Sequence, residues 1–133
     1  MKWINWGEKQ KTGNADMDHG HEKLVELINQ LADGMESKKS KEFCSNVLEQ
    51  FVEETRKHFT IEERLMDLHR YPKAKEHTAM HERFLKDVLT FKASYDAGAT
   101  AEFTTLLVIL DSWVNRDIMV ADKGLAEFLA TAG

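Results

Sequence analysis

The 133-residue sequence contains only one cysteine, Cys44, and one proline, Pro72. A single cysteine excludes an internal disulfide and a zinc site built from several cysteines. No apolar run approaches the roughly 20 residues that span a bilayer, and the first residues form no apolar signal-peptide segment. We therefore expect a cytoplasmic protein without a membrane partner. The net charge of −5 and the lack of a dense Lys/Arg cluster argue against nucleic acid as a partner.

Glycine and proline are so sparse that they leave four long segments uninterrupted: 21–33, 35–71, 73–97 and 99–123. In each segment apolar residues recur at spacings of three and four, which is typical of amphipathic helices. Ser40 has the character of a helix N-cap, and Gly34 and Gly98 predict helix ends. We expect an all-α protein with one domain over residues 1–133, folded as an antiparallel up-down four-helix bundle.

The two ends of the chain are expected to lie outside the four long helices. The leader, residues 1–17, carries Trp3, Ile4 and Trp6, which we expect to pin it against the bundle. The tail, residues 124–133, has enough apolar residues to dock as a short C-terminal helix.

Each predicted helix carries polar side chains on or beside its apolar stripe. Burying such groups costs free energy unless they are paired, hydrogen-bonded or bound to a metal. Imidazole and carboxylate are the ligands expected for iron, manganese or zinc. The residues of this kind are His21, His58, Glu62, His77, His81, Asp117 and Asp122.

The spacing of these residues favours one metal site inside the bundle. His58 and Glu62 are four residues apart, as are His77 and His81, so each pair lies on one helix face. Either pair alone is also common in helical proteins without a metal. Asp117 and Asp122 are five residues apart, about 140° around an α-helix, so we expect them not to be equivalent ligands.

Several motifs resemble those of the hemerythrins, above all the bacterial single-domain form. A tryptophan-bearing opening over residues 3–14 is followed by MDHGHEKL at 17–24 and HFTIEERLM at 58–66. HTAMH follows at 77–81 and WVNRDIMVADK at 113–123. The resemblance extends over nearly the whole chain.

The resemblance implies O2 binding at a non-haem centre of two iron ions, bridged by oxo or hydroxo when oxidised. Carried over by position, one iron is held by His21 and His58, the other by His77 and His81. Both are bridged by Glu62 and Asp122. The family's O2 pocket corresponds to Met66, Trp113 and Ile118.

This sequence departs from the family at two positions: Asp117 replaces the fifth ligand histidine, and Gly20 stands where the family usually has Gln. Asp117 could ligate a metal directly, act through a bound water, or turn away and leave a coordination position open. Direct ligation would add negative charge and favour ferric iron, whereas an open position would admit water or substrate.

Three classes of function remain. The first is O2 storage, delivery or sensing by a protein whose site autoxidises readily. The second is enzyme-like peroxide reduction or O2 activation at an opened, carboxylate-rich site. The third is a helical module without a metal. We expect the first, with O2 or a related diatomic or peroxide as the partner, and a monomeric chain.

Overall fold

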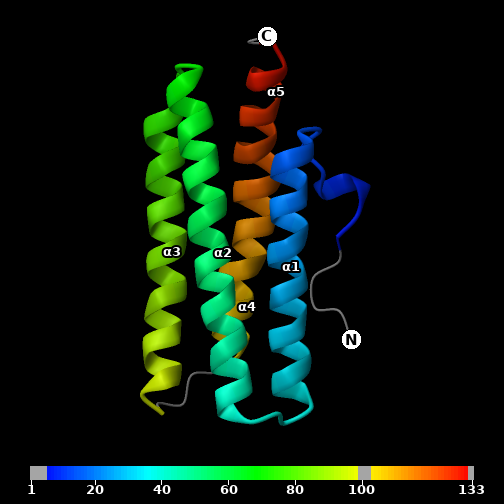
Figure 1. Cartoon of the computed structure of the whole chain (residues 1–133), viewed down its shortest axis with the longest axis vertical. Helices are drawn as coiled ribbons and strands as arrows, with labels where there is room; N and C mark the ends of the chain where they lie inside the picture. Colours follow the sequence, from blue (N-terminus) through cyan, green and yellow to red (C-terminus); the bar gives the residue numbers. More distant parts are fainter. Residues whose placement is uncertain (1–5, 99–102, 132–133) are drawn as a thin grey trace.

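The computed structural model describes residues 6–98 and 103–131, and the described residues contain helices and no strands. A short 3-10 helix, η1, spans Glu8–Gln10. The long elements are α1 (Ala15–Glu36), α2 (Lys41–Leu68), α3 (Ala74–Asp96), α4 (Phe103–Ser112), η2 (Trp113–Asp122) and α5 (Lys123–Thr131). The last three follow one another without a break and form a single rod (Figure 1).

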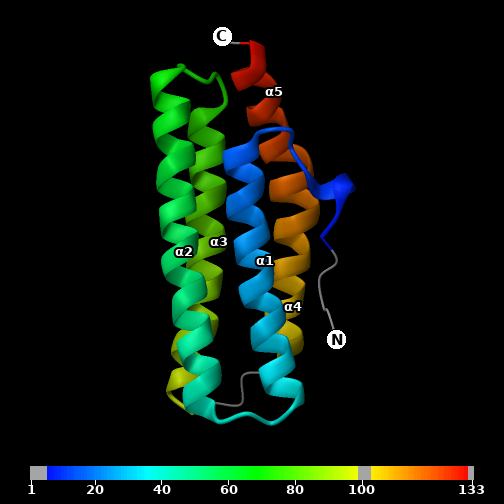
Figure 2. The same ribbon diagram turned by 45° about the vertical axis from the view of Figure 1, so that its right-hand side comes forward.

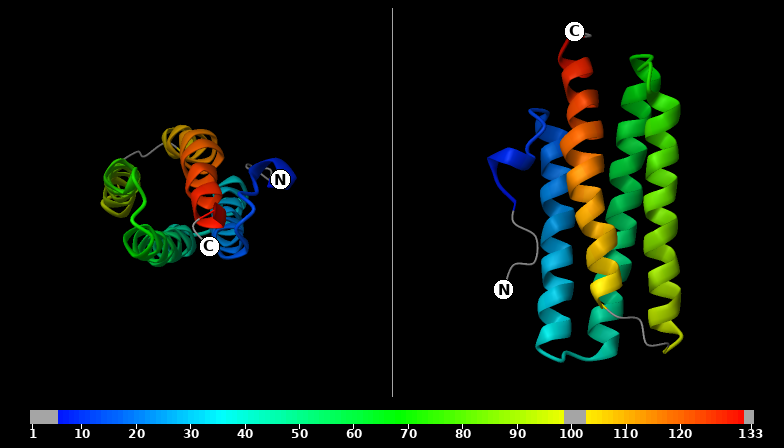
Figure 3. Two further views of the ribbon diagram at one scale, coloured as in Figure 1. Left: turned by 90° about the horizontal axis from the view of Figure 1, so that it is seen from above. Right: turned by 180° about the vertical axis from the view of Figure 1, so that it is seen from behind.

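The four rods run alternately up and down around a common interior. α1 and α2 are joined at one end of the molecule, and α2 and α3 at the other (Figures 1 and 2). Seen along its length, the bundle places the four rods around a common axis (Figure 3). This confirms the expected all-α antiparallel four-helix bundle. Among the described residues, no helix has the length and apolar character needed to cross a membrane.

Two apolar clusters fill the interior. The larger runs along most of the bundle and includes Leu24, Phe51, Val88 and Trp113. The smaller one occupies the end where α1 and α3 begin, and it consists of Met17, Met66, Leu125 and Ala126. Burial of these side chains supplies most of the free energy that holds the helices together.

The structure agrees with two of the three predicted helix boundaries. The Ser40 hydroxyl accepts a hydrogen bond from the Phe43 N–H and caps α2. Gly98 follows α3 with a positive φ of 81°, a conformation that favours glycine. Gly34, however, lies inside α1, which continues to Glu36. A Cβ at Gly34 would come within 2.8 Å of the Phe43 ring, so this glycine permits close helix packing rather than ending the helix.

The fourth rod differs from a regular α-helix in its middle third. Residues of η2 form a π-helix, and the Lys123 N–H at its end bonds to the Ile118 carbonyl five residues back. The expected short C-terminal helix is α5, which continues this rod instead of folding separately.

The described part of the leader up to Asn14 lies outside the long helices, as expected, whereas residues 15–17 already belong to α1 and Met17 is buried in the core. Trp6 packs against the larger apolar cluster, and its ring lies 5.9 Å from that of His21. Trp3 and Ile4, the other two predicted anchors, lie outside the described residues.

Candidate metal centre

Six potential ligands from all four rods meet at one end of the bundle. Because the chain alternates in direction, the starts of α1 and α3 lie beside the ends of α2 and η2. All six side chains are buried, and the most accessible of them, His58, is only 6% exposed. The six are His21, His58, Glu62, His77, His81 and Asp122.

The six residues form two groups that share both carboxylates. One group is His21, His58, Glu62 and Asp122, and the other is Glu62, His77, His81 and Asp122. Within each group, one ligand atom per residue lies within 4.8 Å of all the others. Two adjacent histidine pairs with two common carboxylates are the arrangement required for two metal ions with carboxylate bridges.

The carboxylate oxygens are divided between the two groups. Glu62 Oε2 contacts His58 Nε2 and lies 3.7 Å from His21 Nε2. Glu62 Oε1 lies 2.9 Å from His77 Nε2 and 3.2 Å from His81 Nε2. Asp122 is divided in the same way: Oδ2 lies 2.8 Å from His21 Nε2, and Oδ1 lies 2.9 Å from His77 Nε2. Each carboxylate therefore presents one oxygen to each histidine pair.

The donor atoms are poorly satisfied by one another. Among the described residues, five buried atoms of this cluster make no hydrogen bond of acceptable geometry: His21 Nδ1, His21 Nε2, His58 Nε2, Glu62 Oε2 and Asp122 Oδ1. Orphaned buried polar atoms are rare because each costs free energy. The cluster thus contains many nitrogen and oxygen atoms that could bind a metal and that make no well-aligned hydrogen bond. Such a set of donor atoms fits metal ions.

Protonation reflects the same crowding in the metal-free chain. Burial alone would lower the pKa of His21, but contacts with Asp122 and Glu62 outweigh it and raise that pKa to about 9. The pKa of His77 is also raised to about 9, since the same two carboxylates outweigh its burial. Burial would raise the pKa of Glu62, but the surrounding histidines hold it well below its ordinary value. Protons on His21 and His77 therefore occupy positions that metal ions would take.

The surroundings of His81 contain two residues that sequence reasoning did not single out. Glu63 Oε2 lies 3.2 Å from His81 Nδ1 and accepts its proton in a hydrogen bond, leaving Nε2 free for the cluster. The Phe59 ring stacks on the imidazole at 3.8 Å and nearly parallel. Both residues belong to the motif at 58–66, and Glu63 could have been identified as a carboxylate one residue beyond a candidate ligand.

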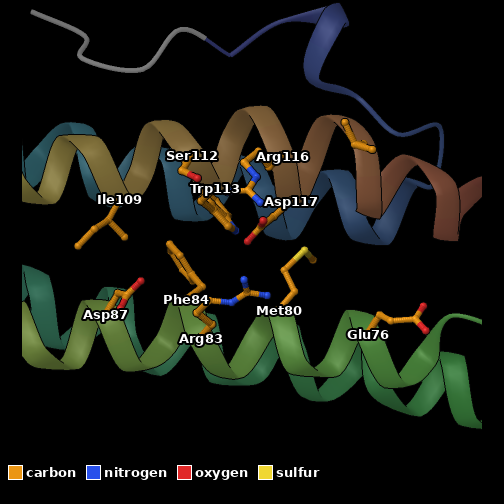
Figure 4. Close-up of a pocket in the computed structure, with 11 residues that line it drawn as sticks. Glu76, Met80, Arg83, Phe84, Asp87, Ile109, Ser112, Trp113, Arg116 and Asp117 are labelled. Carbon is orange, nitrogen blue, oxygen red and sulfur yellow. The ribbon is translucent and has the colours of Figure 1, made fainter.

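Asp117 lies outside both groups of donor atoms. Its half-buried side chain lines a pocket between α3 and the fourth rod, and its carboxyl points into that space (Figure 4). Burial, together with the negative charge of Asp122, raises the pKa of Asp117 to about 6 despite opposing effects of His81, Arg116 and His77. The electrostatic effects of Asp122, His81 and His77 indicate that Asp117 lies near the donor atoms, although it belongs to neither group of potential ligands.

The π-helix changes the relation between Asp117 and Asp122 expected from the sequence. In a π-helix the hydrogen bonds join residues five apart, so such residues lie nearly on the same side. The estimate of 140° assumed an α-helix and does not apply to η2. Both aspartates consequently face the interior side of the rod, about one turn apart.

Met66, Trp113 and Ile118 are all fully buried near the cluster. Met66 belongs to the small apolar cluster beyond the donors, whereas Trp113 and Ile118 belong to the large one. The Trp113 ring lies 6.1 Å from that of His21. The donors therefore lie between two apolar clusters, which limits access of water. The binding of O2 by these three residues stays a prediction.

Gly20 lies directly against the ring of His58. A Cβ at this position would lie 2.3 Å from His58 Nδ1 and 2.8 Å from Cε1. The imidazole of His58 thus occupies the space that a side chain at position 20 would need.

Comparison with known proteins agrees with this site. The sequence pattern of the hemerythrin HHE cation binding domain matches residues 12–129. The chain is 29% identical to a bacteriohemerythrin of Pseudomonas aeruginosa (strain LESB58) over 127 residues, covering 96% of this chain and 82% of that protein. It is 27% identical to a bacteriohemerythrin of Ralstonia nicotianae over 133 residues, covering 100% of this chain and 93% of that protein. A bacteriohemerythrin of Aquifex aeolicus is 39% identical over 79 residues, covering 56% of this chain and 60% of that protein. The chain belongs to the hemerythrin family.

Proposed function

We propose that this protein, as a single hemerythrin-like domain in the cytoplasm, binds O2 reversibly at a centre of two iron ions. The observation that carries the proposal is the division of Glu62 and Asp122 between two histidine pairs. Iron in such a centre supplies electrons that can be shared with O2 and recovered when O2 leaves. The protein's residues hold the two ions together, and the apolar clusters on either side exclude water.

Each residue of the cluster has a separate task in this proposal. His21 and His58 would hold one ion, His77 and His81 would hold the other, and Glu62 and Asp122 would offer an oxygen to each. The hydrogen bond from His81 to Glu63 fixes the orientation of the imidazole and its tautomer. Met66, Trp113 and Ile118 form the apolar surroundings that slow the entry of protons.

Asp117 makes oxidation of the centre easier. A carboxylate beside the His77 and His81 pair adds negative charge, which favours the higher oxidation state of iron. The pocket at Asp117 also gives water a route toward that side of the centre. We therefore expect the O2 complex of this protein to autoxidise readily.

The test is to mix reduced, iron-loaded protein with O2 and follow visible absorption by stopped flow. We expect about two iron ions per chain and an O2-dependent band that disappears when O2 is removed early and decays later. Asp117→His should slow the decay by restoring the family's ligand. The matched control is His19→Gln, which changes an exposed histidine two residues from His21 and should leave the decay unchanged.

Two results would contradict the proposal. A carefully prepared protein with only trace metal would exclude the centre itself. A stable band in the wild type that Asp117→His leaves unchanged would exclude the role of Asp117.

A second candidate function is peroxide reduction or O2 activation on a small substrate. The specific observation in its favour is the pocket of about 430 Å³ that reaches Asp117 from the surface. Rapid, repeated consumption of O2 or peroxide in the presence of a reductant would favour this function over reversible binding.

A further inference from the structure

The pocket that contains Asp117 has the size of a binding site for a small molecule. It lies between α3 and the fourth rod and has a volume of about 430 Å³, within the range of roughly 300–1,000 Å³ typical of ligand sites. Figure 4 shows side chains from both helices pointing into the space between them.

Two arginines line this pocket, and neither forms an ion pair at contact distance, although Arg116 acts on the nearby Asp117 carboxyl through its charge. Arg83 comes from α3 and Arg116 from η2. Within residues 6–98 and 103–131, no carboxylate oxygen lies within 4.0 Å of either guanidinium group. Glu76 and Asp87 lie at the two ends of the pocket, away from its middle (Figure 4). A guanidinium group binds carboxylates through two parallel hydrogen bonds, so two guanidinium groups outside any close ion pair favour an anion here.

The inner wall of the pocket is apolar. Phe84 and Trp113 stack with ring centres 5.4 Å apart and an angle of 17° between the ring planes. Both rings are almost entirely buried, and Met80 lines the pocket beside them. Such a wall accommodates a flat or aliphatic body, whereas inorganic phosphate would leave it uncovered.

We propose that this pocket binds a small organic acid, with its carboxylate held by Arg83 and Arg116 and its apolar body against Phe84 and Trp113. Asp117 lines the same pocket, so the bound molecule lies beside the residue that replaces the family's fifth histidine. The pocket lies on the α3 side of the fourth rod, and it shares Trp113 with the surroundings of His21. The proposal does not depend on reversible O2 binding.

Benzoate is a suitable probe because it combines a carboxylate with a flat ring, and benzamide has the same shape without the charge. Isothermal titration calorimetry of the metal-loaded protein should show benzoate binding and at least tenfold weaker binding of benzamide. Arg83→Gln and Arg116→Gln should each weaken benzoate binding about tenfold or more, since hydrogen bonds to charged groups are the stronger class. Arg64→Gln, which changes an exposed arginine of α2 outside this pocket, should have no effect.

Asp117→Asn gives a test with the opposite sign. Removing a negative charge from the wall of an anion site should strengthen benzoate binding. Thermal melts of all variants check folding, and Arg83→Lys, which retains the charge but not the fork of donors, should keep part of the affinity.

The proposal is wrong if benzoate does not bind, or if benzamide binds equally well. It is also wrong if benzoate binds and neither arginine substitution weakens it, because the anion would then bind the metal directly. O2 binding is measured without benzoate, so failure of one proposal is distinguishable from failure of the other.

Discussion

Replacing Gly20 by alanine should selectively damage one half of the metal centre. The added Cβ would lie 2.3 Å from Nδ1 and 2.8 Å from Cε1 of His58. Favourable non-bonded contacts need about 3.5 Å, so the imidazole must move by roughly 1 Å. His58 cannot absorb this movement freely, because its ring lies 4.5 Å from that of His21 and 6.2 Å from that of Phe59.

The expected loss of metal affinity follows from how little the distance between a metal ion and its ligand can vary. Ligand distances are held to within about 0.2 Å, so a displacement of roughly 1 Å removes Nε2 of His58 from its position. Disturbing the support of a ligand typically lowers metal affinity about 10–100-fold. The metal-free fold should suffer less, since alanine in place of a helical glycine contributes about 0.5–1 kcal/mol of stability.

The assay is anaerobic titration with ferrous iron against a competing chromogenic chelator. In Gly20→Ala we expect one tight step, assigned to His77 and His81, and a second step weakened about 10–100-fold. Gly34→Ala is the matched control, because its Cβ would also press on a ring of α2, 2.8 Å from Phe43, far from the donors. It should leave both affinities unchanged, because the exposed Phe43 ring can turn aside without disturbing the donors. Two wild-type affinities in Gly20→Ala, or equal losses in both variants, would refute the reasoning.

Three further predictions rest on the raised pKa values. Metal binding to the metal-free protein at pH 7 should release about two protons, because the pKa values of His21 and His77 are about 9; calorimetry in buffers of different ionisation enthalpy measures the number. The stabilisation from these two histidines is fully present below pH 6.5 and is lost as pH rises through about 9, so melting temperatures of the metal-free protein should fall over that interval. For Asp117 the raised pKa of about 6 means that its carboxylate destabilises the metal-free fold above that pH. Asp117→Asn should therefore raise the stability at pH 7.5 by about 1–2 kcal/mol after allowing for solvent screening, or roughly 3–6 °C in melting temperature, and the gain should vanish below pH 4.

The sequence was sufficient to predict the bundle and the residues that meet inside it. Apolar spacing of three and four marks a helix whatever its partners are, and His58 with Glu62, or His77 with His81, must share a face. The antiparallel order then brings the start of α3 beside the end of α2. These features depend on local geometry and short connections, which a sequence states directly.

Features that depend on contacts between helices were not predictable in this way. Gly34 resembles a helix end in the sequence, but α1 continues through it to Glu36, and the Phe43 ring of α2 lies where a side chain at position 34 would be. The role of Gly20 is hidden for the same reason, since it is defined by a histidine 38 positions away in the chain. The hydrogen bond from His81 to Glu63 also joins two helices.

The π-helix η2 determines how Asp117 and Asp122 are placed relative to each other. An α-helix through residues 113–122 would turn Asp117 well away from Asp122, whereas hydrogen bonds between residues five apart bring both to the interior side. The rarity of π-helices indicates that the wider turn costs free energy, and those that occur are frequently found at functional sites. In this chain it lets Asp122 supply one oxygen to each histidine pair while Asp117 faces the pocket between Arg83 and Arg116. A histidine at position 117 would extend further toward His77 and His81 than aspartate does. We therefore expect the shorter side chain of Asp117 to leave more space between the donors and the pocket than a histidine would.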